Sequence, residues 1–115
     1  MTAGRRATGT WGESQVARWY EARGYEILAR NWRSTAGELD LVVAREREVV
    51  FCEVKSRSGP AFGSPAEAVT AGKQLRLRRL AAQWLDADDR SWADVRFDVA
   101  SVVRGRVDEV IEAAF

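Results

Sequence analysis

Apolar residues near the start of the chain recur at the spacing of an amphipathic helix. The apolar positions of this helix are Val16, Ala17 and Tyr20. Glu13 stands three residues before the first of them, at the edge of the same face. We expect the helix to cover residues 10–23 and to end at Gly24, since glycine readily adopts the backbone conformation of a helix C-cap. Residues 1–8 precede this pattern, and we expect them to be disordered.

A second helix is predicted after the loop that contains Gly59, Pro60 and Gly63. Ser-Pro-Ala-Glu at residues 64–67 fits a capping box with proline at the first helical position. The helix should run to about Leu85, with a point where it can break at residues 70–72. Its apolar stripe consists of Leu77, Leu80, Ala81 and Trp84.

The remaining apolar segments have the length and the alternation of β-strands. The predicted strands are residues 25–32, 38–44, 49–55 and 95–103, and residues 107–111 can add a short edge strand. A short charged connection joins the second strand to the third, as in a hairpin. The order α-β-β-β-α-β predicts a single α/β domain over residues 1–115, with a central mixed β-sheet flanked by helices.

The composition limits the chemistry that is available to this chain. It contains no histidine and one cysteine, Cys52, which excludes Ser-His-Asp and Cys-His catalysis, an internal disulfide and a cysteine-cluster zinc site. An active site would have to rely on carboxylates and on Lys, Arg, Tyr, Ser or Thr. Carboxylate oxygens without His or Cys suit hard cations such as Mg²⁺ or Mn²⁺.

Charge and hydropathy bear on where the protein works. The net charge is +1, so any binding of nucleic acid would depend on local basic patches rather than on the total charge. No apolar run approaches the roughly 18 residues that a membrane-spanning helix needs. Residues 1–12 contain two arginines but no following apolar block, unlike a signal peptide. We therefore expect a cytoplasmic protein with no membrane partner.

The predicted hairpin brings acidic and basic residues together. Glu38 and Asp40 share one face of their strand, and Glu53 and Lys55 share one face of the next. If Glu46 and Arg47 form the two-residue loop, Asp40 lies opposite Glu53, and Glu38 lies opposite Lys55. Directly opposed residues of an antiparallel pair point to the same face, about 5 Å apart at Cβ. A slip of one residue would destroy this arrangement.

Several carboxylates so close together repel one another unless a cation or a proton compensates them. A Mg²⁺ or Mn²⁺ ion between Asp40 and Glu53 would do so, and Lys55 would orient a nucleophile or neutralise a phosphate. Glu13 becomes a third ligand if its helix packs over this face, with Glu38 in support. The alternative is a surface ion-pair ladder, which would contribute little free energy. The apolar residues on both faces of these strands favour the metal site.

Basic residues outside the hairpin suggest a surface for nucleic acid. Lys73, Arg76 and Arg79 recur at helical spacing beside the apolar stripe of the second helix, and Arg57 follows the third strand. These side chains suit contacts to phosphates. The alternative is that they form an ordinary solvated helix face.

At these residues the chain resembles the YraN-like family of small uncharacterised bacterial proteins. That family is similar to archaeal Holliday-junction resolvases and to the restriction-endonuclease-like superfamily, whose signature is P-D…(D/E)-x-K. The segments that carry the resemblance are Gly12-Glu13, Gly24-Tyr25, Asn31-Trp32-Arg33, Gly37-Glu38-Leu39-Asp40-Leu41, Val50-Phe51-Cys52-Glu53-Val54-Lys55-Ser56-Arg57, Phe62-Gly63, Lys73 and Arg96-Phe97-Asp98-Val99. Leu39 stands where the superfamily signature has proline.

The resemblance implies a restriction-endonuclease-like fold and a metal-dependent nuclease. It implies Asp40 and Glu53 as metal ligands, Lys55 as the catalytic lysine and Glu13 as the acid of the first helix. The expected substrate is branched or otherwise structured DNA, rather than RNA, and paired cutting of a duplex would need a homodimer. Two alternatives remain open: a non-catalytic nucleic-acid-binding or adaptor protein on the same fold, and a sheet-based protein-interaction module.

Overall fold

The computed structural model describes residues 3–57 and 65–115 of the chain. Its elements are α1 (Ala3–Glu21), β1 (Glu26–Ser34), β2 (Gly37–Arg45), β3 (Glu48–Arg57), the 3₁₀ helix η1 (Pro65–Ala68), α2 (Ala71–Ala87), β4 (Asp94–Val103) and β5 (Arg106–Ile111). Within this part of the chain, the strands form one sheet in the order β1-β2-β3-β4-β5. Strands β3 and β4 are parallel and the other neighbours are antiparallel, so the predicted mixed sheet is confirmed.

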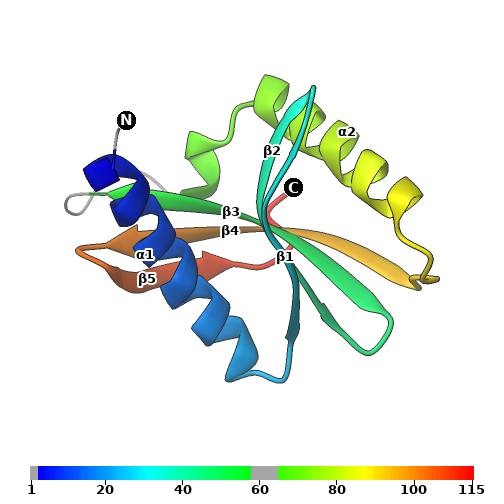
Figure 1. Cartoon of the computed structure of the whole chain (residues 1–115), viewed down its shortest axis with the longest axis horizontal. Coiled ribbons are helices and arrows are strands. Elements are labelled where there is room, and N and C mark those ends of the chain that lie inside the picture. The colour runs from blue at the N-terminus through cyan, green and yellow to red at the C-terminus, as the bar shows by residue number, and fades with distance from the viewer. Residues whose placement is uncertain (1–2, 58–64) are drawn as a thin grey trace.

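The two long helices cover opposite faces of the sheet (Figure 1). The apolar layer between α1 and the sheet consists of Val16, Ala17 and Tyr20 of the helix and Leu41, Val43, Val50, Cys52, Ala100 and Val102 of the strands. The layer between α2 and the sheet consists of Val42, Val49, Phe51 and Val99 of the strands and the predicted stripe of the helix, Leu77, Leu80, Ala81 and Trp84. Because each helix buries the stripe that its sequence periodicity indicates, burial of apolar surface accounts for the layered arrangement. None of the helices in the described ranges is long and apolar enough to cross a membrane.

The helix boundaries differ from the prediction. Helix α1 begins at Ala3 instead of residue 10, so backbone that was expected to lack structure is helical from Ala3. The second helix is divided, as its possible break suggested: η1 ends at Ala68 and α2 begins at Ala71. Thr70 caps α2, because its hydroxyl oxygen accepts a hydrogen bond from the backbone N–H of Lys73 at 3.2 Å. The proposed cap at Ser64 lies outside the described residues.

The observed order of elements contains one strand more than the predicted order. The predicted edge segment forms β5, which pairs with β4, so the sequence α-β-β-β-α-β continues with a further β-strand. In β2, strict alternation would place Leu39 and Leu41 on one face, but Leu39 packs on the α2 side, with Val42, and Leu41 packs on the α1 side. Opposite this point, Asn31 of β1 has a left-handed backbone with φ 53°, which interrupts the regular pleat of the strand pair.

The predicted register of the β2–β3 hairpin is confirmed as far as Leu41 and Cys52, but the ladder does not reach the expected pairs of Asp40 with Glu53 and of Glu38 with Lys55. Arg45 pairs with Glu48, and the ladder continues to Leu41 and Cys52. Glu46 has φ 57°, the left-handed conformation that a two-residue hairpin loop requires. The loop therefore fixes which residues of β2 and β3 face each other.

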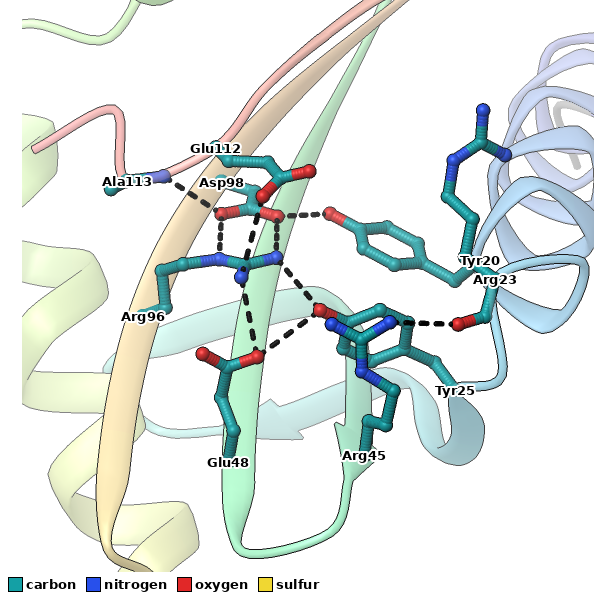
Figure 2. Close-up of polar contacts among 9 residues, drawn as sticks. All are labelled: Tyr20, Arg23, Tyr25, Arg45, Glu48, Arg96, Asp98, Glu112 and Ala113. Atoms are coloured by element: carbon teal, nitrogen blue, oxygen red, sulfur yellow. Dashed lines mark hydrogen bonds and ion pairs between the residues drawn. The ribbon is translucent and has the colours of Figure 1, made fainter.

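A buried polar network joins β4 to α1 and to the end of the chain (Figure 2). Asp98 is fully buried and receives hydrogen bonds from Tyr20 Oη at 2.5 Å, from Arg96 Nε at 2.9 Å and from the backbone N–H of Ala113 at 3.0 Å. Arg96 also pairs with Glu48 at 3.2 Å. Asp98 is thus a structural acid, and its partners satisfy a charge that would otherwise be costly to bury.

A candidate metal centre where two strands separate

The candidate site lies just beyond the last paired residues of β2 and β3. Past Leu41 and Cys52, the side chain of Asp40 replaces the backbone as the partner of β3: its Oδ2 accepts a hydrogen bond from the backbone N–H of Val54 at 2.8 Å. Asp40 is thereby held beside Glu53, its expected neighbour across the hairpin. The separation of the strands opens the space in which the acidic side chains meet.

Glu53 is buried and forms an ion pair with Lys73 in the first turn of α2. Lys73 Nζ lies 2.6 Å from Glu53 Oε2, and the side chains are 32% and 6% exposed. Thr70 caps this turn and fixes the start of the helix that carries Lys73. Lys73 was expected to bind phosphate on the helix surface, whereas the structure places its ammonium group against a carboxylate of the site.

Asp40 and Glu53 share one proton between them. Burial, followed by the hydrogen bond to Glu53 and the repulsion from its charge, raises the pKa of Asp40 to about 9. Burial alone would also raise the pKa of Glu53, but hydrogen bonds from Asp40 and Lys73 and the charge of Lys73 lower it. Near neutral pH, Glu53 is therefore the ionised partner of Lys73, and Asp40 holds the proton.

Lys55 is half-buried at the same end of β3. Burial and the neighbouring ammonium group of Lys73 lower its pKa, while the carboxylates of Glu53 and Asp40 act in the opposite direction. Two lysines therefore converge on this acidic pair, one from β3 and one from α2. The sequence pattern predicted Lys55 at this site, but it did not predict the contact of Lys73 with Glu53.

Glu13 reaches the site from the face covered by α1. The side chain is 9% exposed, and its Oε2 has no hydrogen-bond partner among the residues that the structure describes. Burial raises the pKa of Glu13, a hydrogen bond with Asn31 lowers it, and the charge of Glu38 raises it. Gly12 permits a close approach of α1, because a Cβ there would lie 2.9 Å from Ser56 Oγ on β3.

The acids Glu13, Glu38 and Asp40 form a compact group. Each can offer one carboxylate oxygen, and these three oxygens lie within 4.8 Å of one another. Glu38 is the more accessible member: its side chain is 33% exposed, and Arg33 Nε lies 3.1 Å from its Oε2. Three carboxylate oxygens at this separation, from a group that includes the buried Glu13, fit a hard divalent cation such as Mg²⁺ or Mn²⁺.

Glu38, Asp40 and Glu53 line a pocket of about 420 Å³ between β2 and α2, of whose lining Glu13 is not a part. Its lining is formed by Ala36, Gly37, Glu38, Asp40, Glu53, Lys73, Arg76, Leu77 and Leu80. Of the other residues expected to bind nucleic acid, Arg76 is exposed at this pocket, whereas Arg79 and Arg57 are not part of its lining. The pocket can admit a phosphate beside carboxylates, the ammonium group of Lys73 and the guanidinium of Arg76.

The structure adds Asn31 to the predicted site and gives the predicted residue Lys73 a different partner. Asn31 lies opposite Asp40 in the β1–β2 pair, since its neighbours Arg30 and Trp32 pair with Leu41 and Leu39, and it contacts Glu13. The segment containing Asn31 belongs to the observed resemblance, but nothing in its spacing points to Glu13. The sequence predicted Lys73 only as a basic residue on a helix surface. Its contact with Glu53 depends on how α2 packs against the sheet.

Comparison with known proteins supports a family assignment. Residues 12–102 match the sequence model of the uncharacterised protein family UPF0102. A UPF0102 protein of Beutenbergia cavernae is 53% identical over 100 residues, covering 87% of this chain and 85% of that protein. The corresponding protein of Frankia casuarinae is 54% identical over 98 residues, with coverage of 85% and 83%. That of Mycobacterium ulcerans is 49% identical over 107 residues, with coverage of 91% and 88%.

Proposed function

The chain belongs to the uncharacterised protein family UPF0102, and we propose that it is a Mg²⁺- or Mn²⁺-dependent nuclease that hydrolyses phosphodiester bonds. The observation that carries this proposal is the convergence of Asp40, Glu53 and Lys55 with the unpartnered oxygen of Glu13 beside an open pocket. Several buried acids close together, one of them with an oxygen that has no partner among the described residues, are costly, so a functional ligand is the simplest reason for their retention. The resemblance to restriction-endonuclease-like nucleases is consistent with this set.

The acids would hold the cation. Asp40, Glu53 and Glu13 are the ligands expected from the sequence, and Glu38 adds a further oxygen at the mouth of the site. When bound, a divalent cation would lower the pKa of a coordinated water and offset negative charge on the phosphate. Cation binding would require the proton on Asp40 to leave, since a protonated carboxyl is a poor ligand.

The two lysines would act on the phosphate and on the acids. The ammonium group of Lys55, half-buried near Asp40 and Glu53, is suited to neutralising the charge that develops on a reacting phosphate. Lys73 keeps Glu53 ionised and fixes its rotamer through the ion pair. Arg76 at the pocket, with Arg79 and Arg57 farther out, would contact the neighbouring phosphates of the strand.

We propose DNA as the substrate, and in particular branched or structured DNA, on the basis of the resemblance to archaeal Holliday-junction resolvases. One small domain carries one such site, so paired cleavage of a duplex would use a homodimer in the cytoplasm. The open shape of the pocket is suited to an extended polymer rather than to an enclosed small molecule.

A cleavage assay tests the proposal. Labelled four-way junction, flap, duplex and single-stranded DNA would be incubated with Mg²⁺ or Mn²⁺ and the wild-type protein, with Asp40→Asn as the inactive variant. Arg104→Gln, in the β4–β5 turn, is the control because its charge lies outside the site. We expect metal-dependent cleavage by wild type and control and none by Asp40→Asn. Cleavage that persists in Asp40→Asn or without metal would refute the assignment.

A second candidate function is supported by the Lys73–Glu53 ion pair, which already neutralises one acid of the site without a metal. On this view the protein binds nucleic acid through its arginines and does not cut it. DNA binding that is equally tight with EDTA and with Mg²⁺, together with no cleavage of any substrate, would favour this alternative.

A further inference from the structure

We propose that the first divalent cation binds between Glu13, Glu38 and Asp40, with Glu38 as a direct ligand, while Glu53 stays paired with Lys73. This inference rests on the proposed function in taking a Mg²⁺- or Mn²⁺-type ion as the ligand. It differs in the ligand set, because it replaces the acid of the E-x-K segment with an acid of β2. Glu38 and Asp40 would thus both be direct ligands of the first cation.

The distances favour this position. One oxygen from each of Glu13, Glu38 and Asp40 lies within 4.8 Å of the other two, so a small inward rotation brings all three to the 2.0–2.6 Å bonds of Mg²⁺ or Ca²⁺-like ions. The three acids come from the two sides of the site, one from α1 and two from β2. The separation of two residues along β2 directs Glu38 and Asp40 to the same pocket.

The buried oxygen of Glu13 is the independent sign of a ligand. Its carboxylate is 9% exposed, and Oε2 lacks a partner among the described residues although Asn31 contacts the group. A buried carboxylate oxygen without a hydrogen-bond donor destabilises the folded protein. Asn31 and the charge of Arg30 leave this oxygen without a hydrogen bond to the described part of the chain, and a cation between Glu13, Glu38 and Asp40 would contact all three carboxylates.

Glu53 already has an ion-pair partner on the other side of Asp40. Lys73 Nζ contacts its Oε2 at 2.6 Å, and this close ion pair is largely buried. Insertion of a metal between Asp40 and Glu53 would have to displace that ammonium group or bring a second cation next to it. Glu38, by contrast, is held by Arg33 in an exposed pair of the kind that contributes little free energy. Glu38 is therefore the acid that can be recruited at lower cost.

The experiment compares two double variants that each remove one ion pair and leave the net charge unchanged. Arg33→Gln/Glu38→Gln removes the proposed ligand, and Glu53→Gln/Lys73→Gln removes the acid that we expect to be spared. Mn²⁺ binding to the full chain would be measured by electron paramagnetic resonance of the free ion, and folding would be checked by urea unfolding in EDTA. Arg33→Gln alone controls for the loss of the arginine.

We expect Arg33→Gln/Glu38→Gln to weaken binding of the first Mn²⁺ by about 10-fold or more, and Glu53→Gln/Lys73→Gln to change it by less than about 3-fold. Arg33→Gln should bind at least as tightly as wild type. The reverse order of the two double variants would overturn the inference and leave the proposed function intact. Absence of Mn²⁺ binding to the folded wild-type protein would instead overturn the proposed metal-dependent function itself.

Discussion

Asp40 Oδ2 accepts a hydrogen bond from the backbone N–H of Val54 at 2.8 Å, one step beyond the last paired residues of β2 and β3. A side chain thus continues the hydrogen bonding of the sheet at the point where the backbones part. This contact fixes the carboxyl group in place without a metal. It also allows the protonated group to donate to Glu53 from its other oxygen, which is the arrangement that the raised pKa of Asp40 reflects.

The first prediction concerns Asp40→Asn and pH. The folded pKa of about 9 lies above the unfolded pKa of 3.8, so the native state holds a proton that the unfolded chain has lost between these values. Stability of the metal-free wild-type protein should therefore fall as pH rises from about 4 toward 9. Asparagine reproduces the protonated group, accepting from Val54 and donating to Glu53, and does not titrate.

Urea unfolding of both proteins in EDTA at pH 5, 6.5 and 8 tests this prediction. We expect Asp40→Asn to be the more stable protein, by a margin that grows by on the order of 1 kcal/mol per pH unit. Glu53 does not disturb the comparison, since its lowered pKa places its titration below this range. A margin independent of pH would show that Asp40 is ionised in the folded protein.

The second prediction concerns Lys73→Gln. Removal of the ammonium group leaves the buried carboxylate of Glu53 without its ion-pair partner. We expect a loss of about 1–3 kcal/mol in the free energy of unfolding of the metal-free protein. Arg79→Gln, on the exposed face of the same helix, is the matched control and should change stability by less than about 0.5 kcal/mol. Equal effects of the two variants would mean that the Lys73–Glu53 pair adds nothing to stability.

The third prediction separates Lys55 from the metal ligands. Lys55→Gln removes a charge that we assign to the phosphate and leaves every acid of the site in place. We expect DNA cleavage to fall by about 100-fold or more, whereas Mn²⁺ affinity should stay the same or rise, because a nearby positive charge is lost. Parallel cleavage and Mn²⁺-binding measurements provide the test. A fall in metal affinity large enough to explain the lost cleavage would contradict the assigned role.

The fourth prediction concerns the network around Asp98 (Figure 2). Burial raises the pKa of the Tyr20 hydroxyl, so it remains protonated and donates to Asp98 at 2.5 Å. Asp98→Asn should destabilise the protein by about 3 kcal/mol, because it leaves the half-buried Arg96 without its main partner. Tyr20→Phe removes one hydrogen bond to a charged group and should cost about 2 kcal/mol.

Tyr25→Phe is the graded control for this network. Its hydroxyl contacts Glu48 at 3.1 Å and Arg96 at 3.3 Å, in a less buried position than Tyr20. We expect a cost of about 1 kcal/mol. Denaturant midpoints of the three variants establish the order, and Mn²⁺ affinity should be unaffected since the network is separate from the acids of the site. A different order would mean that burial does not set the strength of these contacts.

Much of the fold was predictable because it depends on local patterns. The register of β2 and β3 followed from the length of one charged connection, and the confirmed Arg45–Glu48 pair places Asp40 beside Glu53. The apolar stripe of α2 followed from helical periodicity. The start of α1 was not predictable, since residues 3–9 have no amphipathic pattern that would mark them as helical.

The composition also determined which chemistry remained available. A chain without histidine and with one buried cysteine must build any metal site from carboxylates, and the local spacing of Glu38, Asp40, Glu53 and Lys55 brings such groups together in one hairpin. These conclusions rely on neighbours within about 17 residues of one another, for which strand alternation and loop length set the geometry.

The tertiary structure decided the contacts between residues far apart in the sequence. Periodicity states which face of a helix is buried, but not where along a strand that helix comes to rest, so neither the ion pair of Lys73 with Glu53 nor the contact of Glu13 with Asn31 could be read from spacing. Both depend on packing of α1 and α2 against opposite faces of the sheet. The sequence by itself determined which charged groups are available to the site, and packing determined which of them form ion pairs and which, such as Glu13, keep a buried oxygen without a hydrogen bond to any described residue.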